Sequence, residues 1–209
     1  MSQKRSASSA KWLAEHEADP YVQEARRLGY RSRAAFKLIE LNEKDKLIKP
    51  GMVVVDLGAA PGGWSQLARP LLGKKGRVIA TDILDMEPLP EVDFLMGDFR
   101  EETVLKAVEA LVGAHAVDLV LSDMAPNLSG IDSADQASSL YLCELALEFA
   151  KAHLKAGGVF VAKVFQGEGF DAYVKTVRAA FVSVTIRKPK ASRPRSREVY
   201  LVAKNFRRV

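Results

Sequence analysis

Three charged side chains of this 209-residue chain stand where they could do chemistry together. Lys163 lies inside the apolar run VFVAKVF, and a buried ammonium is costly, so it must be paired or reach an opening. Asp123 ends the preceding predicted strand, and Glu198 begins the last one. If the last strand runs antiparallel, it starts at the edge where the parallel strands end, and the three side chains can meet there. A structural salt bridge at that edge is the alternative interpretation.

A lysine flanked by two carboxylates suits the methylation of a hydroxyl group. A neutral ribose hydroxyl is a poor nucleophile, and the lysine could orient it, stabilise the developing alkoxide or take its proton. The carboxylates favour the charged ammonium, so electrostatic stabilisation competes with general-base action, and the sequence leaves both open. A sulfonium methyl donor brings its own leaving group, so the protein mainly has to position and polarise the reactants.

A glycine-rich turn follows the first predicted strand in the segment DLGAAPGGW, residues 56–64. Its place between strand and helix is that of a dinucleotide-binding turn, G-x-G-x-x-G. However, Ala60 stands where the second glycine would let the backbone approach a pyrophosphate. The turn therefore predicts a nucleoside ligand without a pyrophosphate, such as S-adenosylmethionine. Around its methionine portion we expect Gly58, Gly62, Gly63 and, as one wall or as a core residue, Trp64.

Acidic residues lie at or near the ends of four predicted strands, namely Asp56, Asp82, Asp98 and Asp123. In an open α/β sheet, ligands bind outside the carboxyl ends of the parallel strands. One aspartate there could cap a helix or form a turn, but four of them together with Lys163 indicate a binding site. Asp82, 20 residues after Gly62, has the spacing of a carboxylate that binds a ribose diol. Asp98 could accept a hydrogen bond from the amine of an adenine.

The elements that must position these residues alternate between strand and helix. Strands are predicted at 52–57, 77–82, 92–98, 117–123 and 158–165, and helices at 64–72, 100–112, about 137–154 (ended by Gly157 and Gly158) and 170–181. Near-continuous apolar strands between helices predict an α/β fold with a parallel sheet covered on both faces. The last strands, 183–188 and 198–204, should form an antiparallel hairpin at one edge. We expect residues 1–209 to form a single domain with an N-terminal helical extension at about 1–50.

Charge is unevenly distributed along the chain, whose formal net charge is +5. Basic residues dominate the segments 1–37 and 187–209, whereas acidic residues outnumber basic ones in between. Two basic ends on an acidic body predict binding to a polyanion, although solubilising tails would have the same composition. No apolar run approaches the roughly 20 residues that span a bilayer, and the first residues lack the apolar stretch of a secretory signal. We expect a cytoplasmic protein.

Cysteine and histidine indicate neither thiol nor metal chemistry. Cys143 lies in a helical pattern and is expected to be a small core residue. The three histidines, His16, His115 and His153, are far apart and have no cysteine partners in metal-binding spacing, so we predict no metal.

Long motifs spread over the whole chain resemble the FtsJ/RlmE family of ribosomal-RNA 2′-O-methyltransferases. They are KRSASS, RSRAAFKL, DLGAAPGGWSQ, GDFR, SDMAPN, GGVFVAKVFQGEGF and RKPKASRPRSREVY, and none departs from the family's pattern. The resemblance implies a class I S-adenosylmethionine-dependent methyltransferase fold, which is Rossmann-like, with a mostly parallel seven-stranded sheet and an antiparallel edge strand. It implies methylation of the ribose 2′-hydroxyl of a uridine in the A-loop of 23S rRNA, on the assembling 50S subunit.

The resemblance also assigns residues. The family's catalytic set would be Lys37, Asp123, Lys163 and Glu198, and its cofactor-binding set would include Gly62, Trp64, Asp82, Asp98 and Asp123. Without the resemblance, Lys37 would be read as part of a solvated helical stripe with Arg33, Glu40 and Lys44. The basic ends would hold RNA phosphates, chiefly through Arg31, Arg33, Arg193, Arg195 and Arg197. We expect a monomer that needs no metal.

Other functions remain open at this point. Relatives that methylate tRNA share the catalytic set, and a non-catalytic RNA-binding protein of ribosome assembly could share the fold. A nicotinamide-dependent oxidoreductase is disfavoured by Ala60 and Pro61 in the turn. DNA or protein as the methyl acceptor is only weakly excluded by the basic flanks.

Overall fold

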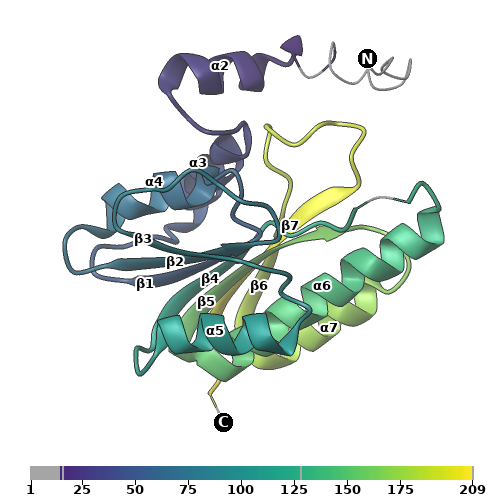
Figure 1. Ribbon diagram of the computed structural model, residues 1–209. Coiled ribbons are helices and arrows are strands. Elements are labelled where there is room, and N and C mark those ends of the chain that lie inside the picture. Colours follow the sequence, from purple (N-terminus) through teal and green to yellow (C-terminus); the bar gives the residue numbers. More distant parts are fainter. Residues whose placement is uncertain (1–14, 16, 128, 209) are drawn as a thin grey trace.

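A seven-stranded mixed sheet forms the centre of the computed structural model, which describes residues 15, 17–127 and 129–208 (Figure 1). The strands lie in the order β3-β2-β1-β4-β5-β7-β6. Their bounds are β1 Val53–Leu57, β2 Arg77–Asp82, β3 Val92–Met96, β4 Val117–Ser122, β5 Leu154–Phe165, β6 Phe181–Arg187 and β7 Glu198–Phe206. The first five strands pair in parallel, whereas β7 is antiparallel to both of its neighbours, β5 and β6. The predicted mostly parallel α/β sheet is confirmed.

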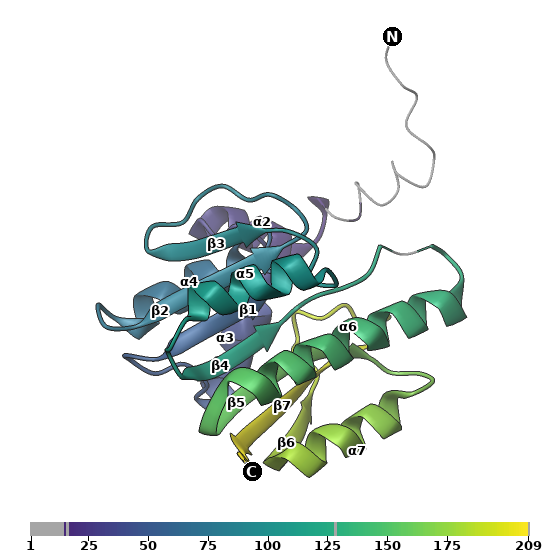
Figure 2. The ribbon, with the colours of Figure 1, turned by 60° about the horizontal axis from the view of Figure 1, so that its bottom comes forward.

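Helices cover both faces of the sheet (Figures 1 and 2). They are α2 Pro20–Leu28, α3 Ala34–Asp45, α4 Gly63–Leu72, α5 Glu102–Val112, α6 Asp132–His153 and α7 Phe170–Ala180. One apolar core fills the space between the sheet and α5, α6 and α7, and a second core lies under α3 and α4. Among the described residues, none of the helices is long and apolar enough to cross a membrane.

The predicted antiparallel hairpin is confirmed, and its strands β7 and β6 form one edge of the sheet. β6 is the outer strand, and β7 returns between β6 and β5. This return places Glu198, the first residue of β7, opposite Phe165, the last residue of β5. The start of β7 therefore lies at the edge where the parallel strands end, as the sequence argument required.

The prediction for the long helix before β5 was wrong about its start and about the glycines that end it. α6 begins at Asp132 and stops at His153, before the glycines that were expected to end it. Gly157 and Gly158 instead lie inside β5, which starts at Leu154. The pairing of β4 with β5 shifts register between Val117 and Leu119, and Gly157 has a positive φ of 79° in the extra length of β5. The glycines thus serve an irregularity in the strand and do not cap the helix.

The expected cysteine environment is confirmed. Cys143 is buried in the core beneath α6, and its Sγ lies 3.2 Å from the carbonyl oxygen of Lys163, to which the thiol donates. Burial raises the pKa of the thiol to about 12, so the reactive thiolate is strongly disfavoured near neutral pH.

Helices α2 and α3 occupy the described part of the segment 1–50; residues 1–14 and 16, with the KRSASS motif and His16, lie outside the described residues. Asp19 caps α2 by accepting a hydrogen bond from the Tyr21 backbone at 3.0 Å, and Pro20 opens the helix. Gly29 ends α2 with a left-handed φ of 74°. The chain then turns into α3, which carries Leu38 and Leu41 onto the core.

A charged anchor ties the end of α3 to the last two strands. The buried carboxylate of Asp45 accepts two hydrogen bonds from Arg187 of β6, both at 2.9 Å. Lys204 of β7 donates to the Asp45 carbonyl oxygen at 2.5 Å. The Arg187 hydrogen bonds outweigh burial and, with Lys204, hold the pKa of Asp45 below its usual value. The anchor fixes α3, and therefore Lys37, relative to β7.

Asp45→Ala is expected to lower the free energy of unfolding by about 2 kcal/mol, because it leaves Arg187 without its buried acceptor and removes the carboxylate beside Lys204. Since the pKa of Asp45 is lowered by folding, its contribution is present above the unfolded pKa and is lost as the pH falls through the folded value. Urea unfolding at pH 7 measures the change. Asp93→Ala, which removes the exposed partner of Arg77, is the control and should cost less than about 1 kcal/mol. Equal losses would contradict the anchoring role.

Candidate active site

Four charged side chains meet at the carboxyl edge of the sheet. Lys163 of β5 donates to the backbone carbonyl oxygen of Asp123 at 2.7 Å, and its Nζ lies 3.2 Å from Asp123 Oδ1. Lys37 of α3 forms the second ion pair, with 2.8 Å between its Nζ and Glu198 Oε1. The side chains are 9% and 18% exposed in the first pair and 11% and 12% exposed in the second. The structure thus brings together all three residues singled out from their types and positions, and adds Lys37.

The environment of Lys37 corrects the interpretation of α3 as having a solvated face there. Lys37 lies four residues before Leu41 and eight before Asp45, and all three are buried. Its Nζ also lies 5.6 Å from the ring centroid of Tyr200. The position of Lys37 on the face of Leu41 was the signal in the sequence that could have identified it as buried.

The two carboxylates are anionic at neutral pH. Burial alone would raise the pKa of Asp123, but the nearby ammonium groups of Lys163 and Lys37, with a hydrogen bond from Tyr200, lower it. Burial also opposes ionisation of Glu198, and Lys37 again outweighs it, so that its pKa is lowered. The cluster therefore holds two ammonium groups beside two carboxylates, which is how buried charges are stabilised.

Tyr200 supports this cluster and was not identified from the sequence. It is fully buried, and its hydroxyl donates to Asp123 Oδ1 at 2.8 Å. Its ring packs against Trp64, with 5.8 Å between ring centroids, and in the sheet it lies opposite Lys163. Burial raises the pKa of the phenol well above its usual value, so the hydroxyl stays a donor. The signal was the two-residue period of a strand, which puts Tyr200 on the face of Glu198.

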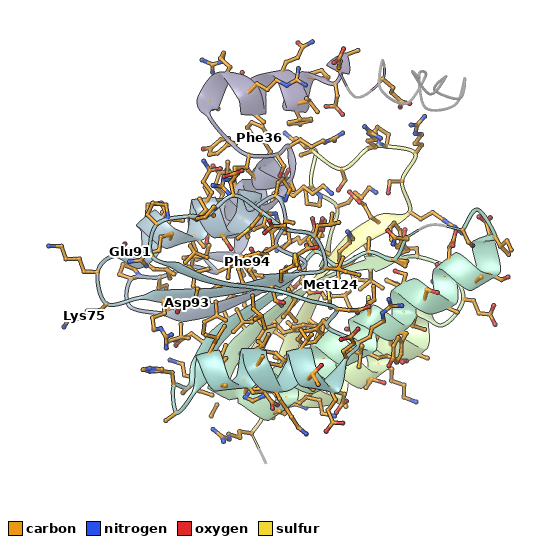
Figure 3. The ribbon with its side chains drawn as sticks, viewed as in Figure 1. Phe36, Lys75, Glu91, Asp93, Phe94 and Met124 are labelled. Atoms are coloured by element: carbon orange, nitrogen blue, oxygen red, sulfur yellow. The ribbon has the colours of Figure 1, made fainter. Side chains whose placement is uncertain are left out.

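The glycines of the turn are needed by the protein itself. A Cβ on Gly58, where φ is 79°, would lie 2.7 Å from the backbone nitrogen of Met124, the residue after Asp123 (Figure 3). A Cβ on Gly63 would lie 2.5 Å from the hydroxyl oxygen of Ser32. Gly62 has a φ of 102°, which strongly favours glycine. The turn is thus pressed between the β4 end and the segment before α3.

The two other predicted cofactor carboxylates lie along the same edge. Asp82 Oδ2 accepts from the Ala60 backbone at 2.9 Å, and Oδ1 accepts from the Leu84 backbone at 2.8 Å. Asp98 is held by Arg100, whose guanidinium approaches it to 2.6 Å. The Arg100 hydrogen bond outweighs burial and lowers the pKa of Asp98. Asp82 accepts one hydrogen bond on each oxygen and keeps lone pairs for a ligand, whereas both oxygens of Asp98 are used by the exposed Arg100.

Three exposed apolar side chains flank these carboxylates. Ile83 and Leu84 follow Asp82 directly, and Met96, which is opposite Asp82 in the sheet, ends β3. Exposed apolar groups beside fixed acceptors form a surface suited to a flat, partly polar ring. They were not identified from the sequence, although an apolar pair directly after a strand-ending aspartate could have indicated them.

Trp64 is a core residue and not a wall of the ligand site. Its side chain is buried, and the indole N–H donates to the Ala34 carbonyl oxygen at 2.8 Å. The ring joins α3, α4 and Tyr200 and does not form an exposed wall. Any contact of Trp64 with a ligand would use its backbone at the start of α4.

Asp56 is the most deeply buried carboxyl of this edge. The Ser65 hydroxyl donates to its Oδ2 at 2.7 Å, while Oδ1 has no hydrogen-bond partner among the described residues. Burial, with smaller contributions from the charges of Asp123 and Asp82, raises the pKa of Asp56 to about 7. Among the described residues, no three His, Cys, Asp or Glu side chains are grouped as metal ligands would be.

A cleft of about 640 Å³ opens beside the charged cluster. It is lined by Arg33, Lys37, Asp132, Asp135, Gln136, Phe165, Arg193, Arg195, Ser196, Arg197 and Glu198. Most of them belong to the loop between β6 and β7 and to the start of α6, two segments that can be followed in Figure 1. Arg195 and Arg197 are 65% and 56% exposed and pair with Glu15 and Asp132. Arg33 and Arg193 pair with Asp19, at the start of α2. Arg31 is not among the described residues that line this cleft.

Comparison with known proteins identifies the family. Residues 30–206 match the FtsJ-like methyltransferase family. The chain belongs to this family. It is 60% identical to Ribosomal RNA large subunit methyltransferase E of Marinobacter nauticus, over 97% of this chain and 98% of that protein. The protein of the same name from Pseudomonas aeruginosa PAO1 is 56% identical over the same shares. A crystal structure described as a ribosomal RNA methyltransferase from Plasmodium falciparum superposes with a TM-score of 0.76 at 30% identity, covering 85% of this chain and 98% of that one.

Asp56→Asn is expected to gain stability relative to the wild type as the pH rises from about 4 to 7. Because folding raises the pKa of Asp56 to about 7, the protonated carboxyl stabilises the wild type at low pH. This stabilisation is lost as the pH rises through that value, because the anion is then buried. The difference in free energy of unfolding should change by a few kcal/mol, at about 1.4 kcal/mol per pKa unit. Urea unfolding at a series of pH values measures it. A difference that stays constant with pH would contradict the buried-anion interpretation.

Proposed function

We propose that this chain transfers a methyl group from S-adenosylmethionine to the ribose 2′-hydroxyl of a uridine in the A-loop of 23S rRNA, on the assembling 50S subunit. The observation that carries the proposal is the pair of buried ion pairs, Lys163–Asp123 and Lys37–Glu198, between a nucleoside-type glycine turn and an arginine-lined cleft. The names of the bacterial relatives support large-subunit rRNA as the substrate. An rRNA substrate implies work in the cytoplasm, and we propose that residues 1–209 act there as one monomeric unit without a metal.

The residues of the cofactor edge fit S-adenosylmethionine. Asp82 has lone pairs left for a ribose diol, and Asp98 would accept from the adenine amine in place of a contact with the exposed Arg100, with Ile83, Leu84 and Met96 as an apolar surface beside them. Gly58, Gly62, Gly63, the Trp64 backbone and Asp123 would surround the methionine portion. The buried Oδ1 of Asp56, at the same edge, has no hydrogen-bond partner among the described residues and could accept a hydrogen bond. When bound, the cofactor supplies an electrophilic methyl group and a neutral thioether leaving group.

The charged cluster can prepare the ribose hydroxyl for attack. We assign to Lys163 Nζ the task of orienting the 2′-oxygen and stabilising the negative charge that develops on it, because it is a hydrogen-bond donor fixed in place by its contacts with Asp123. Asp123 holds Lys163 through two contacts, which fixes the direction of the ammonium. Lys37, held by Glu198, contributes a second positive charge to the same cavity. The hydroxyl proton leaves to solvent through the cleft as the oxygen–carbon bond forms.

The arginines of the cleft would hold RNA phosphates. Arg195 and Arg197 are the most exposed of them, and in the described part of the chain each pairs with a carboxylate that a phosphate could replace. Arg33 and Arg193 are tied to Asp19 and would shape the floor of the same surface. Such contacts position the RNA but carry no base specificity, and they weaken as salt is added.

The test is methylation of large ribosomal subunits that lack the modification, with methyl-labelled S-adenosylmethionine and mapping of the label to nucleotide and atom. The wild type should label one ribose 2′-oxygen. Lys163→Ala should lower the rate at least about 100-fold with cofactor still bound, because a polarising group is lost. Lys151→Ala, which removes an exposed lysine of α6, is the matched control and should behave as the wild type.

Two outcomes would contradict the proposal in different ways. If the protein binds cofactor but labels neither subunits nor free rRNA, the substrate assignment fails, and tRNA becomes the next acceptor to test. If it labels no RNA at all, a non-catalytic role in ribosome assembly replaces the enzyme. Label on a base in place of a ribose would overturn the 2′-hydroxyl assignment.

Tyr200→Phe is expected to lower kcat about tenfold, because Asp123 loses a charge-assisted hydrogen bond without a change in shape. The KM for RNA should hardly change. Since that hydrogen bond lowers the pKa of Asp123, its loss should move the acid limb of the kcat–pH profile to higher pH. Tyr173→Phe, at a buried tyrosine that donates to the Cys143 carbonyl oxygen, is the control. An unmoved profile in Tyr200→Phe would show that the hydroxyl serves only packing.

A further inference from the structure

Arg31 uses its side chain on the protein's own backbone. It lies between α2 and α3, and its guanidinium donates to three carbonyl oxygens: those of Pro61 at 3.2 Å, Glu87 at 2.5 Å and Pro88 at 2.9 Å. Its backbone N–H donates to Gln66 Oε1 at 2.9 Å, and Gln66 donates back to the Gly29 carbonyl oxygen at 2.8 Å. The position of Arg31 is therefore fixed at both its backbone and its side chain.

The three carbonyls belong to the two loops that border the proposed cofactor site. Pro61 is part of the glycine-rich turn, residues 58–63, and Glu87 and Pro88 belong to the loop 83–91 between β2 and β3. The second loop can be followed in Figure 2 as the long connection into β3. Because it begins directly after Asp82 and carries Ile83 and Leu84, its position decides where these residues can meet a ligand.

The two loops also pack on each other beneath Arg31. Met86 of the second loop is buried on Ala59 of the turn, with Leu89 beside them. A Cβ on Gly62 would come within 3.1 Å of both the Arg31 guanidinium and Leu89. Gly62 is thus the place where the guanidinium passes over the turn, and the apolar contact lies below the hydrogen bonds. A small apolar contact alone leaves loops mobile, whereas three fixed hydrogen bonds restrict them.

Only arginine can make this connection. Its planar fork presents five donors in fixed directions, so one side chain can bridge several carbonyls, while lysine offers a single flexible ammonium. Three of the five donors are used on these carbonyls, so a phosphate that took those donors would leave each carbonyl in need of a new one. The exposed Arg195 and Arg197 each pair with one carboxylate among the described residues, and a phosphate there would exchange one ion pair for another.

We propose that Arg31 is a positioning residue that holds the turn 58–63 and the loop 83–91 in the arrangement that binds the cofactor, and is not one of the RNA phosphate contacts. This rests on the proposed cofactor site. It also gives the N-terminal segment a second role. The stretch from Asp19 to Arg33 contributes to the RNA cleft at its ends and to the cofactor loops at Arg31, so cofactor and RNA sites share one support.

The test compares Arg31→Lys with Arg195→Ala in the full chain. Amide hydrogen exchange of the cofactor-free protein reports the loops, calorimetry gives the Kd for S-adenosylmethionine, and a labelled RNA hairpin titrated at several salt concentrations gives the RNA Kd and its salt slope. In Arg31→Lys, we expect at least tenfold faster exchange at residues 59–62 and 84–91 and about tenfold weaker cofactor binding, with the RNA salt slope unchanged. Arg195→Ala should leave the loops and the cofactor Kd unchanged and lower the salt slope by about 0.7.

The lysine substitution separates the two roles, because lysine keeps a phosphate contact but not a fork of hydrogen bonds. Unchanged exchange in both loops, or unchanged cofactor affinity, overturns the proposal. So does an Arg31→Ala variant whose exchange and cofactor affinity match the wild type while its salt slope falls. If Arg31→Ala fails to fold, Arg31→Lys still decides. If the wild type binds no S-adenosylmethionine, the proposed function fails, and the exchange measurement by itself still tests the loop-holding role.

Discussion

Two ammonium groups at the edge of an apolar sheet impose the constraint on which the rest of this structure depends. Neither Lys163 nor Lys37 could stay charged there without an anion beside it, and the fold supplies Asp123 to one and Glu198 to the other. Asp123 comes at the end of β4, next to β5, as the parallel order of the sheet dictates. Glu198 can reach the same edge only because β7 runs against all of its neighbours. The antiparallel insertion of β7 is therefore a requirement of the site.

The same constraint accounts for the position of the N-terminal segment. Lys37 lies on α3, outside the sheet, and α3 must be fixed if Lys37 is to meet Glu198. Three sets of contacts fix it: the Asp45 anchor to β6 and β7, the apolar side chains Leu38 and Leu41, and the hydrogen bond from Trp64 to the Ala34 carbonyl. α2 is attached in turn through Asp19 and Gln66. This N-terminal segment lies outside the Rossmann-like sheet and is part of the proposed active site.

The proposed cofactor and RNA sites lie on either side of one charged cluster and are built differently. The cofactor side consists of short loops packed on each other, in which glycines admit Met124 and Ser32 and backbone groups meet fixed acceptors. The RNA side is a wide cleft of long, exposed side chains whose present partners are the protein's own carboxylates. A rigid site suits a small ligand bound in one geometry, whereas exchangeable ion pairs suit a polyanion.

The sequence by itself determined most of the fold and three of the four residues of the charged cluster. Strand alternation, the glycine turn and the hairpin depend on neighbours within a few residues. The order of strands and helices along the chain, and the shared edge of Asp123, Lys163 and Glu198, therefore followed from local patterns. The way α6 ends did not follow from them. Glycine is permitted both after a helix and within an irregular strand, and only the pairing of Leu154 with Val117 distinguishes the two.

Tertiary structure decided what depends on contacts between distant residues. Lys37 could be taken for a surface residue until α3 was packed on the sheet, and the hydroxyl of Tyr200 gained its meaning only when β7 brought it to Asp123. Arg31 and Arg195 are both arginines in basic segments of the sequence. Arg31 is nevertheless fixed to carbonyls 30 to 57 residues away, whereas Arg195 lies 65% exposed in the cleft. A sequence states which charges exist; which of them are buried, paired or free is set by the packing that surrounds them.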